Sequence, residues 1–280
     1  MNWISYAQLH ADVSSFSATL PPDLVAVVGV PRSGVMAASL LALHRHVHLS
    51  DAETFARTGG FYTPGLRLTA RPPTAGKVLL LDDSAITCRS INAARKQIQQ
   101  SERCGGFELI CGAVYVTPAA VRQLDVSCRI VPMPRVFEWN WLANQQLETW
   151  MSDVDGVLCY DPAAFDDDSP RYEAALRDAV PRYLPRRPVR SLVTCRLARW
   201  RRVTEDWLAR YGVVARELIL HPAPTAEARR KQGRYGQWKG EHYRKSPCTL
   251  FVESSAMQAA VIAQVARKPV LCLENNRMYP

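Results

Sequence analysis

The sequence predicts an α/β protein with two doubly wound parallel-sheet domains. Short, continuous apolar runs alternate with stretches of helical character, which is typical of parallel strands covered by helices on both faces. This alternation restarts after Trp150, and 280 residues suffice for two modest domains. We therefore expect one domain over residues 1–138 and a second over residues 139–280.

Composition narrows the classes of protein and partner. The chain has 35 Lys and Arg against 26 Asp and Glu, a net charge of +9, and 48% of its residues are hydrophobic. That hydrophobic content excludes a disordered chain. No block of like charges marks a nucleic-acid arm, so we expect no nucleic-acid partner, although the net charge keeps nucleic-acid processing as a rival hypothesis.

The cysteines and the apolar runs indicate a cytoplasmic protein. Eight cysteines are scattered singly without a CxxC pair, and several lie in apolar runs, as expected of buried free thiols in a reducing compartment. The first thirty residues lack the features of a signal peptide, and no apolar run is long enough to span a bilayer. We therefore expect no membrane insertion.

Three apolar runs predict the strands of the first domain. The expected elements are strand 24–30 with helix 35–43, strand 78–81 with helix 90–100, and strand 108–116. Residues 54–73 are too long and too rich in Gly and Pro for a plain connection, which indicates either a mobile lid or a surface hairpin. His44, His46 and His48 alternate as on one face of a strand, but no neighbouring ligand completes a metal site.

The second domain has four apolar runs of strand character. The expected elements are strand 151–155, a helix near 172–180, strand 190–194 with a helix to about 211, strand 249–253 with helix 256–266, and a last strand at 270–273. Between the domains, the aromatic-rich residues 132–141 indicate a seam packed against both. We expect eight arginines to form a solvated face rather than a polyanion site: Arg182, Arg186, Arg187, Arg190, Arg196, Arg199, Arg201 and Arg202.

Two adjacent carboxylates follow the apolar run of residues 78–81. At the carboxyl end of a parallel strand, Asp82 and Asp83 would lie in the crevice where α/β sheets bind ligands, with a helix start beyond them to receive a phosphate. Residues 78–90 resemble the phosphoribosyl pyrophosphate (PRPP) motif of type I phosphoribosyltransferases. The resemblance implies that Asp82 and Asp83 hold the ribose hydroxyls, directly or through Mg2+, and that Asp83 serves catalysis. It also implies that the 5-phosphate is wrapped by Thr87, Cys88, Arg89 and Ser90.

A second landmark of that family precedes the acid pair. Residues 30–34, with Arg32, Ser33 and Gly34, resemble the pyrophosphate-binding loop after the first strand, and Arg32 would neutralise the leaving pyrophosphate. Residues 54–73 fall where the family has its flexible catalytic loop. Cys88 and Arg89 stand where the family's turn begins with glycine, which implies an altered turn, weaker binding or a lost activity, unless Arg89 itself contacts the phosphate.

The second domain carries its own phosphate-handling pattern. Asp153 and Asp155 lie at i and i+2 on a strand that breaks at Gly156, so we expect both side chains to point the same way. Residues 152–158 resemble the first motif of haloacid dehalogenase superfamily phosphatases, and three later motifs follow in order. The resemblance implies that Asp153 attacks phosphorus, and that Asp155 protonates the leaving group and then activates water.

Further roles in the second domain follow from the same resemblance. The implied residues are Thr194 for a phosphate oxygen, Lys239 as the cation with Lys231 and Lys245 as rivals, and Asp153, Asp155 and Glu253 for Mg2+. The family more often has aspartate where this chain has Glu253, so the metal site departs from the pattern. The short stretch between the first two motifs leaves no room for a large cap, which predicts an open mouth that suits a bulky substrate or is roofed by the first domain.

Together the two patterns predict a bifunctional ribosyl transfer enzyme. The first domain would move the phosphoribosyl group of PRPP to an acceptor, and the second would remove the 5-phosphate from the product. The favoured acceptor is a glycan hydroxyl, giving β-ribofuranose in a surface polysaccharide, because the first domain is short and offers no evident hood for a base. The alternatives are the same two steps on a nucleobase-like small molecule, or a PRPP-sensing regulatory domain that controls a phosphatase.

Overall fold

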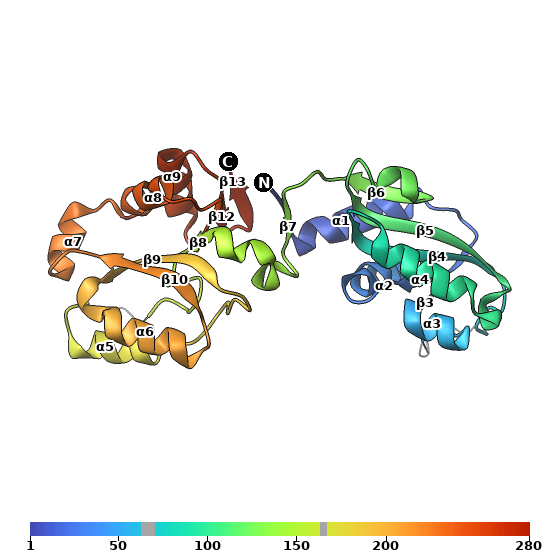
Figure 1. The fold of residues 1–280 in the computed structure, drawn as a ribbon, viewed down its shortest axis with the longest axis horizontal. Coiled ribbons are helices and arrows are strands. Elements are labelled where there is room, and N and C mark those ends of the chain that lie inside the picture. Colours follow the sequence, from blue (N-terminus) through green and yellow to red (C-terminus); the bar gives the residue numbers. More distant parts are fainter. Residues whose placement is uncertain (63–70, 163–166) are drawn as a thin grey trace. The chain divides into compact units, whose positions relative to one another are not determined.

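The computed structural model describes residues 1–62, 71–162 and 167–280. The chain divides into two compact units, Asn2–Arg135 and Val136–Pro280, with Met1 grouped with the latter. Each unit has its own sheet of mainly parallel strands, so the predicted α/β class with separate parallel sheets is confirmed (Figure 1). No helix in these described ranges is long and apolar enough to cross a membrane.

The first unit contains a five-stranded parallel sheet in the order β3-β2-β4-β5-β6. Its elements are β1 (Asn2–Ile4), α1 (Tyr6–Ser17), β2 (Leu24–Gly29), α2 (Ser33–Arg45), β3 (His48–Asp51), α3 (Ala52–Thr58), β4 (Gly76–Ala85), α4 (Arg89–Gln99), β5 (Phe107–Val116) and β6 (Val126–Ile130). Helix α1 packs against α2, and α3 packs against α4. From β2 the chain first forms β3 on one side and then crosses to β4 on the other side. Because such crossovers are right-handed, the helix pair α1–α2 and the helix pair α3–α4 lie on opposite faces of the sheet. The strand order therefore reverses between β2 and β4, where doubly wound sheets bind ligands.

The second unit contains a six-stranded sheet in the order β10-β9-β8-β11-β12-β13, in which only β13 is antiparallel to its neighbour. Its elements, after β7 (Arg135–Phe137) at the boundary, are β8 (Trp150–Ser152), α5 (Pro170–Arg177), β9 (Val189–Leu197), α6 (Arg201–Arg210), β10 (Ala215–His221), α7 (Ala226–Gln232), α8 (Tyr235–Lys245), β11 (Leu250–Glu253), α9 (Ala256–Ala266), β12 (Val270–Cys272) and β13 (Arg277–Tyr279). Helices α5 and α6 pack together, as do α8 and α9. The strand order reverses between β8 and β11, which defines the crevice of this sheet.

Local sequence accounts for the main elements. Residues 78–81 of β4 are fully buried, as expected of a central strand covered on both faces. Polar residues begin the helices: Asp51 accepts hydrogen bonds from two backbone amides of α3, and Ser255 accepts one from Gln258 in α9. Ser169 caps α5, which has Pro170 at its first position, where a missing N–H costs little.

Among the strands of the five- and six-stranded sheets, four are not predicted by the apolar runs, and all four lie at sheet edges. They are β3 and β6 in the first sheet and β10 and β13 in the second. An edge strand packs against only one neighbour, so its sequence need not be continuously apolar. The expectation that residues 270–273 form the last strand is therefore wrong, because β13 follows and pairs antiparallel with β12.

Two local predictions in the first unit need correction. The three histidines do not alternate on one strand: His44 lies in α2, His46 follows it with a left-handed φ of 50°, and His48 begins β3. The turn at His46 breaks the alternation that the sequence suggested. The predicted lid or hairpin begins as helix, since α3 extends to Thr58, and its centre at residues 63–70 lies outside the described residues.

Candidate active sites

The acid pair of the first unit lies within β4 rather than in a turn after it. β2 ends at Gly29, which pairs with Leu81, whereas β4 continues to pair with β5 through Asp82 and on to Ala85. The sequence indicated a strand end at Leu81 because the apolar run stops there. The extended β4 therefore presents Asp82 and Asp83 where the neighbouring strand has already ended, at the reversal of strand order.

The second predicted landmark lies directly beside these acids. Gly34 is in the first turn of α2, and a Cβ atom built on it would lie 2.8 Å from the Leu81 carbonyl oxygen and 3.0 Å from Asp82 Oδ1. At the start of the same helix, Arg32 is exposed and Ser33 is half-buried. The structure thus brings the loop of residues 31–34 and the acid pair into one site, with the Arg32 guanidinium on its surface.

Burial sets the electrostatics of the acid pair. Asp82 and Asp83 are both buried, and the Asp83 amide donates to Asp82 Oδ1 at 2.9 Å. Burial, together with the Asp83 carboxylate, raises the pKa of Asp82 to about 8. Arg135, which the sequence did not single out, is buried nearby, and the Asp83 charge opposes the lowering of the Arg135 pKa by burial. A buried cation therefore balances part of the carboxylate charge.

The predicted phosphate-binding turn has an unusual backbone conformation at Cys88, which stands where the resembled family has glycine. Cys88 immediately precedes α4 and has a left-handed φ of 54°, which glycine adopts without strain. A non-glycine residue pays roughly 1 kcal/mol for this conformation. The Cys88 side chain is buried, whereas Thr87, Arg89 and Ser90 are exposed around the start of the helix. Cysteine therefore occupies a glycine-like backbone position, and the polar side chains of the turn face solvent.

Replacing Gly34 with alanine is expected to disrupt the first site. The added methyl group would meet the Leu81 carbonyl oxygen at 2.8 Å, and backbone atoms cannot yield as a flexible side chain can. We expect a loss of about 1–3 kcal/mol in the free energy of unfolding, measured by thermal melting. Gly105→Ala is the matched control, since its Cβ would make an ordinary contact of 3.4 Å; equal effects of both changes would contradict this account.

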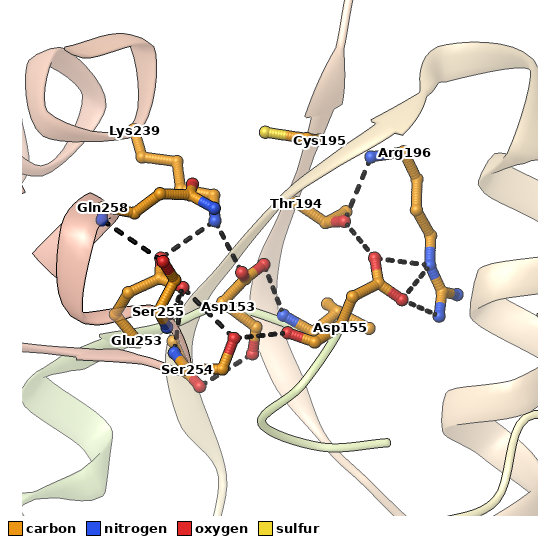
Figure 2. A network of polar contacts seen from close by, with 12 residues as sticks. Asp153, Asp155, Thr194, Cys195, Arg196, Lys239, Glu253, Ser254, Ser255 and Gln258 are labelled. Atoms are coloured by element: carbon orange, nitrogen blue, oxygen red, sulfur yellow. Dashed lines mark hydrogen bonds and ion pairs between the residues drawn. The ribbon is translucent and has the colours of Figure 1, made fainter. Parts of the chain in front are cut away.

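The second site is centred on a buried lysine between two carboxylates (Figure 2). Lys239 Nζ donates to Asp153 Oδ2 at 2.5 Å and to Glu253 Oε2 at 2.9 Å. Asp153 follows β8 and Glu253 ends β11, so the two acids come from the strands that flank the reversal of strand order. Lys239 reaches them from α8. The structure thereby brings three of the predicted phosphatase residues together, whereas the rivals Lys231 and Lys245 are exposed.

Asp155 does not point the same way as Asp153, contrary to the expectation from their spacing. Figure 2 shows the Asp153 carboxylate directed to Lys239 and the Asp155 carboxylate directed to Arg196. β8 ends at Ser152, and Gly156 has a left-handed φ of 74°, so the alternation of an extended strand does not continue through these residues. The two aspartates thus face different cations.

Arg196 belongs to the second site, a position that the sequence does not predict. It was expected on a solvated face, but its side chain is fully buried, with Nη2 2.6 Å from Asp155 Oδ1 and Nε 3.1 Å from Oδ2. Thr194 Oγ1 also donates to Asp155 Oδ2, at 3.0 Å. Thr194 and Arg196 lie at i and i+2 on β9, and this strand spacing was the one signal that could have placed both on the same face.

The ionisation of these groups follows from burial and from their partners. Burial raises the pKa of Asp153, and the Lys239 ammonium opposes that rise. Burial lowers the pKa of Lys239, but the Asp153 and Glu253 carboxylates outweigh it and hold that pKa above its usual value. Burial would also raise the pKa of Asp155, yet the Arg196 guanidinium holds it below the ordinary value. Asp155 is therefore a carboxylate that can accept a proton, and donation of one requires its contact with Arg196 to open.

The residues around Lys239 do not fit a magnesium ion in this arrangement. Carboxylate and carbonyl oxygens are suitable ligands, but one ammonium group already binds both Asp153 Oδ2 and Glu253 Oε2. The other oxygens of these two carboxylates accept backbone amides, from Val154 and from Ser254. Within residues 1–62, 71–162 and 167–280, no group of three or more His, Cys, Asp and Glu is arranged to hold a metal. The reaction that we derive for this site therefore uses no metal ion.

Comparison with known proteins gives matches only among solved structures. No protein-family model matches this chain. No curated protein sequence matches it either.

The similar solved structures include several phosphoribosyltransferases. A purine phosphoribosyltransferase from Pyrococcus horikoshii is 15% identical, with a TM-score of 0.36, over 49% of this chain and 92% of that chain. The xanthine-guanine-hypoxanthine phosphoribosyltransferase of Helicobacter pylori is 16% identical, with a TM-score of 0.39, over 50% of this chain and 93% of its own. An orotate phosphoribosyltransferase from Aeropyrum pernix is 18% identical, with a TM-score of 0.31, over 45% and 71% respectively. Similarity at this level carries no argument about what this chain binds or does.

Proposed function

We propose that this chain is a bifunctional enzyme that transfers a phosphoribosyl group from PRPP to an acceptor and then removes the 5-phosphate from the product. The observation that carries the proposal is that each of the two sheets presents buried carboxylates at its own reversal of strand order. Each crevice also has a cation that acts on its carboxylates, as phosphate chemistry requires: Arg135 in the first unit, and Lys239 and Arg196 in the second. The exposed Arg32, in the loop before Gly34, adds a second cation to the first unit.

The first step uses the site around Asp82 and Asp83. The bond between the anomeric carbon and pyrophosphate breaks, an acceptor atom bonds to that carbon, and the acceptor's proton is released. The carboxylates would hold the ribose hydroxyls, the turn from Thr87 to Ser90 the 5-phosphate, and Arg32 the leaving pyrophosphate. Magnesium would enter this site with the pyrophosphate group of the substrate. The contact of Gly34 with Asp82 supports this arrangement, because it joins the two halves of the pocket.

The second step uses the site around Asp153. An oxygen of Asp153 attacks phosphorus, the ester bond breaks, and the ribosyl oxygen leaves with a proton from Asp155, whose contact with Arg196 opens for this transfer. Water then attacks the aspartyl phosphate, releasing inorganic phosphate and restoring Asp153. Lys239 would neutralise phosphate charge, and Asp155 would take the proton from the attacking water. The ion pair between Asp155 and Arg196 supports this role as a base, since it keeps the carboxylate ionised.

The acceptor is the least constrained part of the proposal. A glycan hydroxyl, giving β-ribofuranose in a surface polysaccharide, is favoured by the short first domain and by the lack of room for a large cap on the second. A nucleobase-like small molecule is the second candidate, and a cavity between the first turns of α8 and α9 favours it. We place both reactions in the cytoplasm, where PRPP and free thiols would coexist; all eight cysteines are unpaired in the structure.

Two substitutions separate the proposed activities. Asp153→Asn should leave pyrophosphate release intact and accumulate a phosphorylated ribosyl adduct, detected by mass spectrometry, because only the nucleophile of the second step is lost. Asp83→Ala should abolish pyrophosphate release from PRPP and spare hydrolysis of a generic phosphate ester. If either substitution eliminates both activities while the protein stays folded, this division of labour is wrong.

A PRPP-sensing regulatory domain is the rival from another class. It would bind PRPP without releasing pyrophosphate, and its occupancy would change the phosphatase rate. Calorimetric binding of PRPP, together with a pyrophosphate assay over a panel of acceptors, distinguishes the two. Binding without release for every acceptor would favour the sensor and overturn the transferase.

A further inference from the structure

We infer that a cavity between the first turns of α8 and α9 binds a planar nitrogen heterocycle, the organic end of the phosphate ester that the second unit hydrolyses. The inference rests on the proposed phosphatase function and names its substrate class. The cavity has a volume of about 310 Å³, which is the size of a small-molecule site. Six of the residues that line it are Arg234, Tyr235, Gln237, Met257, Gln258 and Val261.

The position of the cavity follows from the topology. Helix α8 leads to the start of β11, and α9 follows the end of β11, so both helices begin at the carboxyl edge of the sheet. Lys239 projects from the second turn of α8 to Asp153, and Glu253 ends β11 just before α9. The two helix turns that line the cavity therefore adjoin the second turn of α8, which carries Lys239, and the end of β11, which carries Glu253. The inference requires a substrate with its phosphate at Asp153 to extend between these two turns into the cavity.

Gln258 connects the cavity to the phosphate site. Its backbone amide donates to Ser255 Oγ at 3.4 Å, and the Ser255 amide donates to Glu253 Oε1, so Gln258 belongs to the network drawn in Figure 2. Its side chain also lines the cavity. One residue thus belongs to both the carboxylate network and the cavity wall.

The lining chemistry favours a heterocycle over a sugar. Tyr235, Met257 and Val261 offer apolar surface, and an aromatic ring or a thioether suits the face of a flat ring. Arg234 adds a guanidinium plane, a group on which bases commonly stack. None of the described lining residues is an aspartate or glutamate that would bind the hydroxyl groups of a glycan residue.

Gln258, one of the residues that line the cavity, also has a hydrogen-bond acceptor that is unpaired within the ranges that the structure describes. Gln258 Oε1 is buried and has no hydrogen-bond partner in the described part of the chain. Leaving such an oxygen unsatisfied is unfavourable, so a ligand that supplies a donor is stabilised by forming this bond. A ring N–H or exocyclic amino group supplies that donor, while the flat faces of the same ring remain free to pack against the apolar lining.

The test compares phosphate esters that share the ribose 5-phosphate group and differ beyond it. The panel contains ribose 5-phosphate, methyl β-ribofuranoside 5-phosphate as the glycan-like ester, and purine and pyrimidine nucleoside 5′-monophosphates. We expect kcat/KM for at least one nucleoside monophosphate to exceed that of the methyl riboside at least tenfold, mainly through KM. Equal values across the panel would overturn the inference while leaving the phosphatase proposal intact.

Variants and direct binding separate the cavity from the catalytic site. Gln258→Leu should reduce the preference for the nucleotide over the methyl riboside about tenfold, and Met257→Ala, at a residue 77% exposed, should reduce it without affecting folding. Gln264→Leu is the matched control, because Gln264 is an exposed glutamine on the same helix. Saturation-transfer NMR with the unphosphorylated nucleosides should show binding that Gln258→Leu weakens. Absence of nucleoside binding overturns the cavity assignment, whereas hydrolysis of no ester at all, with binding retained, overturns only the phosphatase proposal.

Discussion

Replacing Lys239 with methionine is expected to destabilise the second unit and abolish the phosphatase activity that we propose for it. The lysine side chain is 2% exposed and makes ion pairs with Asp153 and Glu253, which are themselves 6% and 0% exposed. Removing the cation leaves two buried carboxylates close together without compensation, at a cost of roughly 3–5 kcal/mol in the free energy of unfolding. Denaturant unfolding measures that loss. Hydrolysis of a generic phosphate ester should fall by at least about 10²-fold, since the cation for the phosphate is also gone.

The rival lysine provides the control for this experiment. Lys231 is also on a helix that precedes β11, but its side chain is 75% exposed and pairs with Glu227, which is 69% exposed. Lys231→Met should therefore leave both the unfolding free energy and the hydrolysis rate unchanged. The double variant Lys239→Met with Glu253→Gln should recover part of the lost stability, because it removes one of the two stranded charges. Similar losses for the variants at Lys231 and Lys239 would show that the buried contacts are not the cause.

The central strands could be predicted from the sequence because burial on both faces forces a continuous apolar run. β2, β4 and β5 carry such runs, and the central strands β8, β9 and β11 of the second sheet do so over shorter lengths. The edge strands do not, because one side of each meets solvent or the chain's own loops. β3, with the sequence His-Leu-Ser-Asp, shows the difference: three of its four residues are polar, and no apolar run marks it.

The candidate residues could be predicted where a motif fixes their order, but their partners could not. Asp153, Lys239 and Glu253 meet because the strand ends that carry two of them are neighbours and a helix brings the third. Arg196 and Arg135 belong to no motif, and arginine is most often a surface residue. Only the fold shows that Arg135 lies near the buried Asp83 and that Arg196 pairs with the half-buried Asp155. Those buried cations decide which carboxylates are ionised, and hence which chemical roles the aspartates can take.

Replacing Arg196 with methionine is expected to remove the cation that keeps Asp155 ionised. The guanidinium makes two contacts with Asp155 Oδ1 and one with Oδ2, so the variant leaves a carboxylate that is 20% exposed with the weaker donors Thr194 and Cys159. We expect a loss of roughly 3–5 kcal/mol in the free energy of unfolding at pH 7, measured in denaturant. Arg177→Met is the control, since its ion pair with Glu173 is exposed on both sides and its removal should leave the unfolding midpoint unchanged.

The pH dependence of this loss tests its cause. In the natural protein the pKa of Asp155 lies below its unfolded value of about 3.9, so the stabilisation by the ion pair is complete above that pH and is lost as the pH falls through the folded pKa. In the Arg196→Met variant, burial raises the pKa of Asp155 instead, and the folded state takes up a proton as the pH falls from 7 to 5. The difference in unfolding free energy between the two proteins should therefore shrink over this range. A difference that stays constant between pH 7 and pH 5 would mean that lost packing, and not the charge of Asp155, explains the role of Arg196.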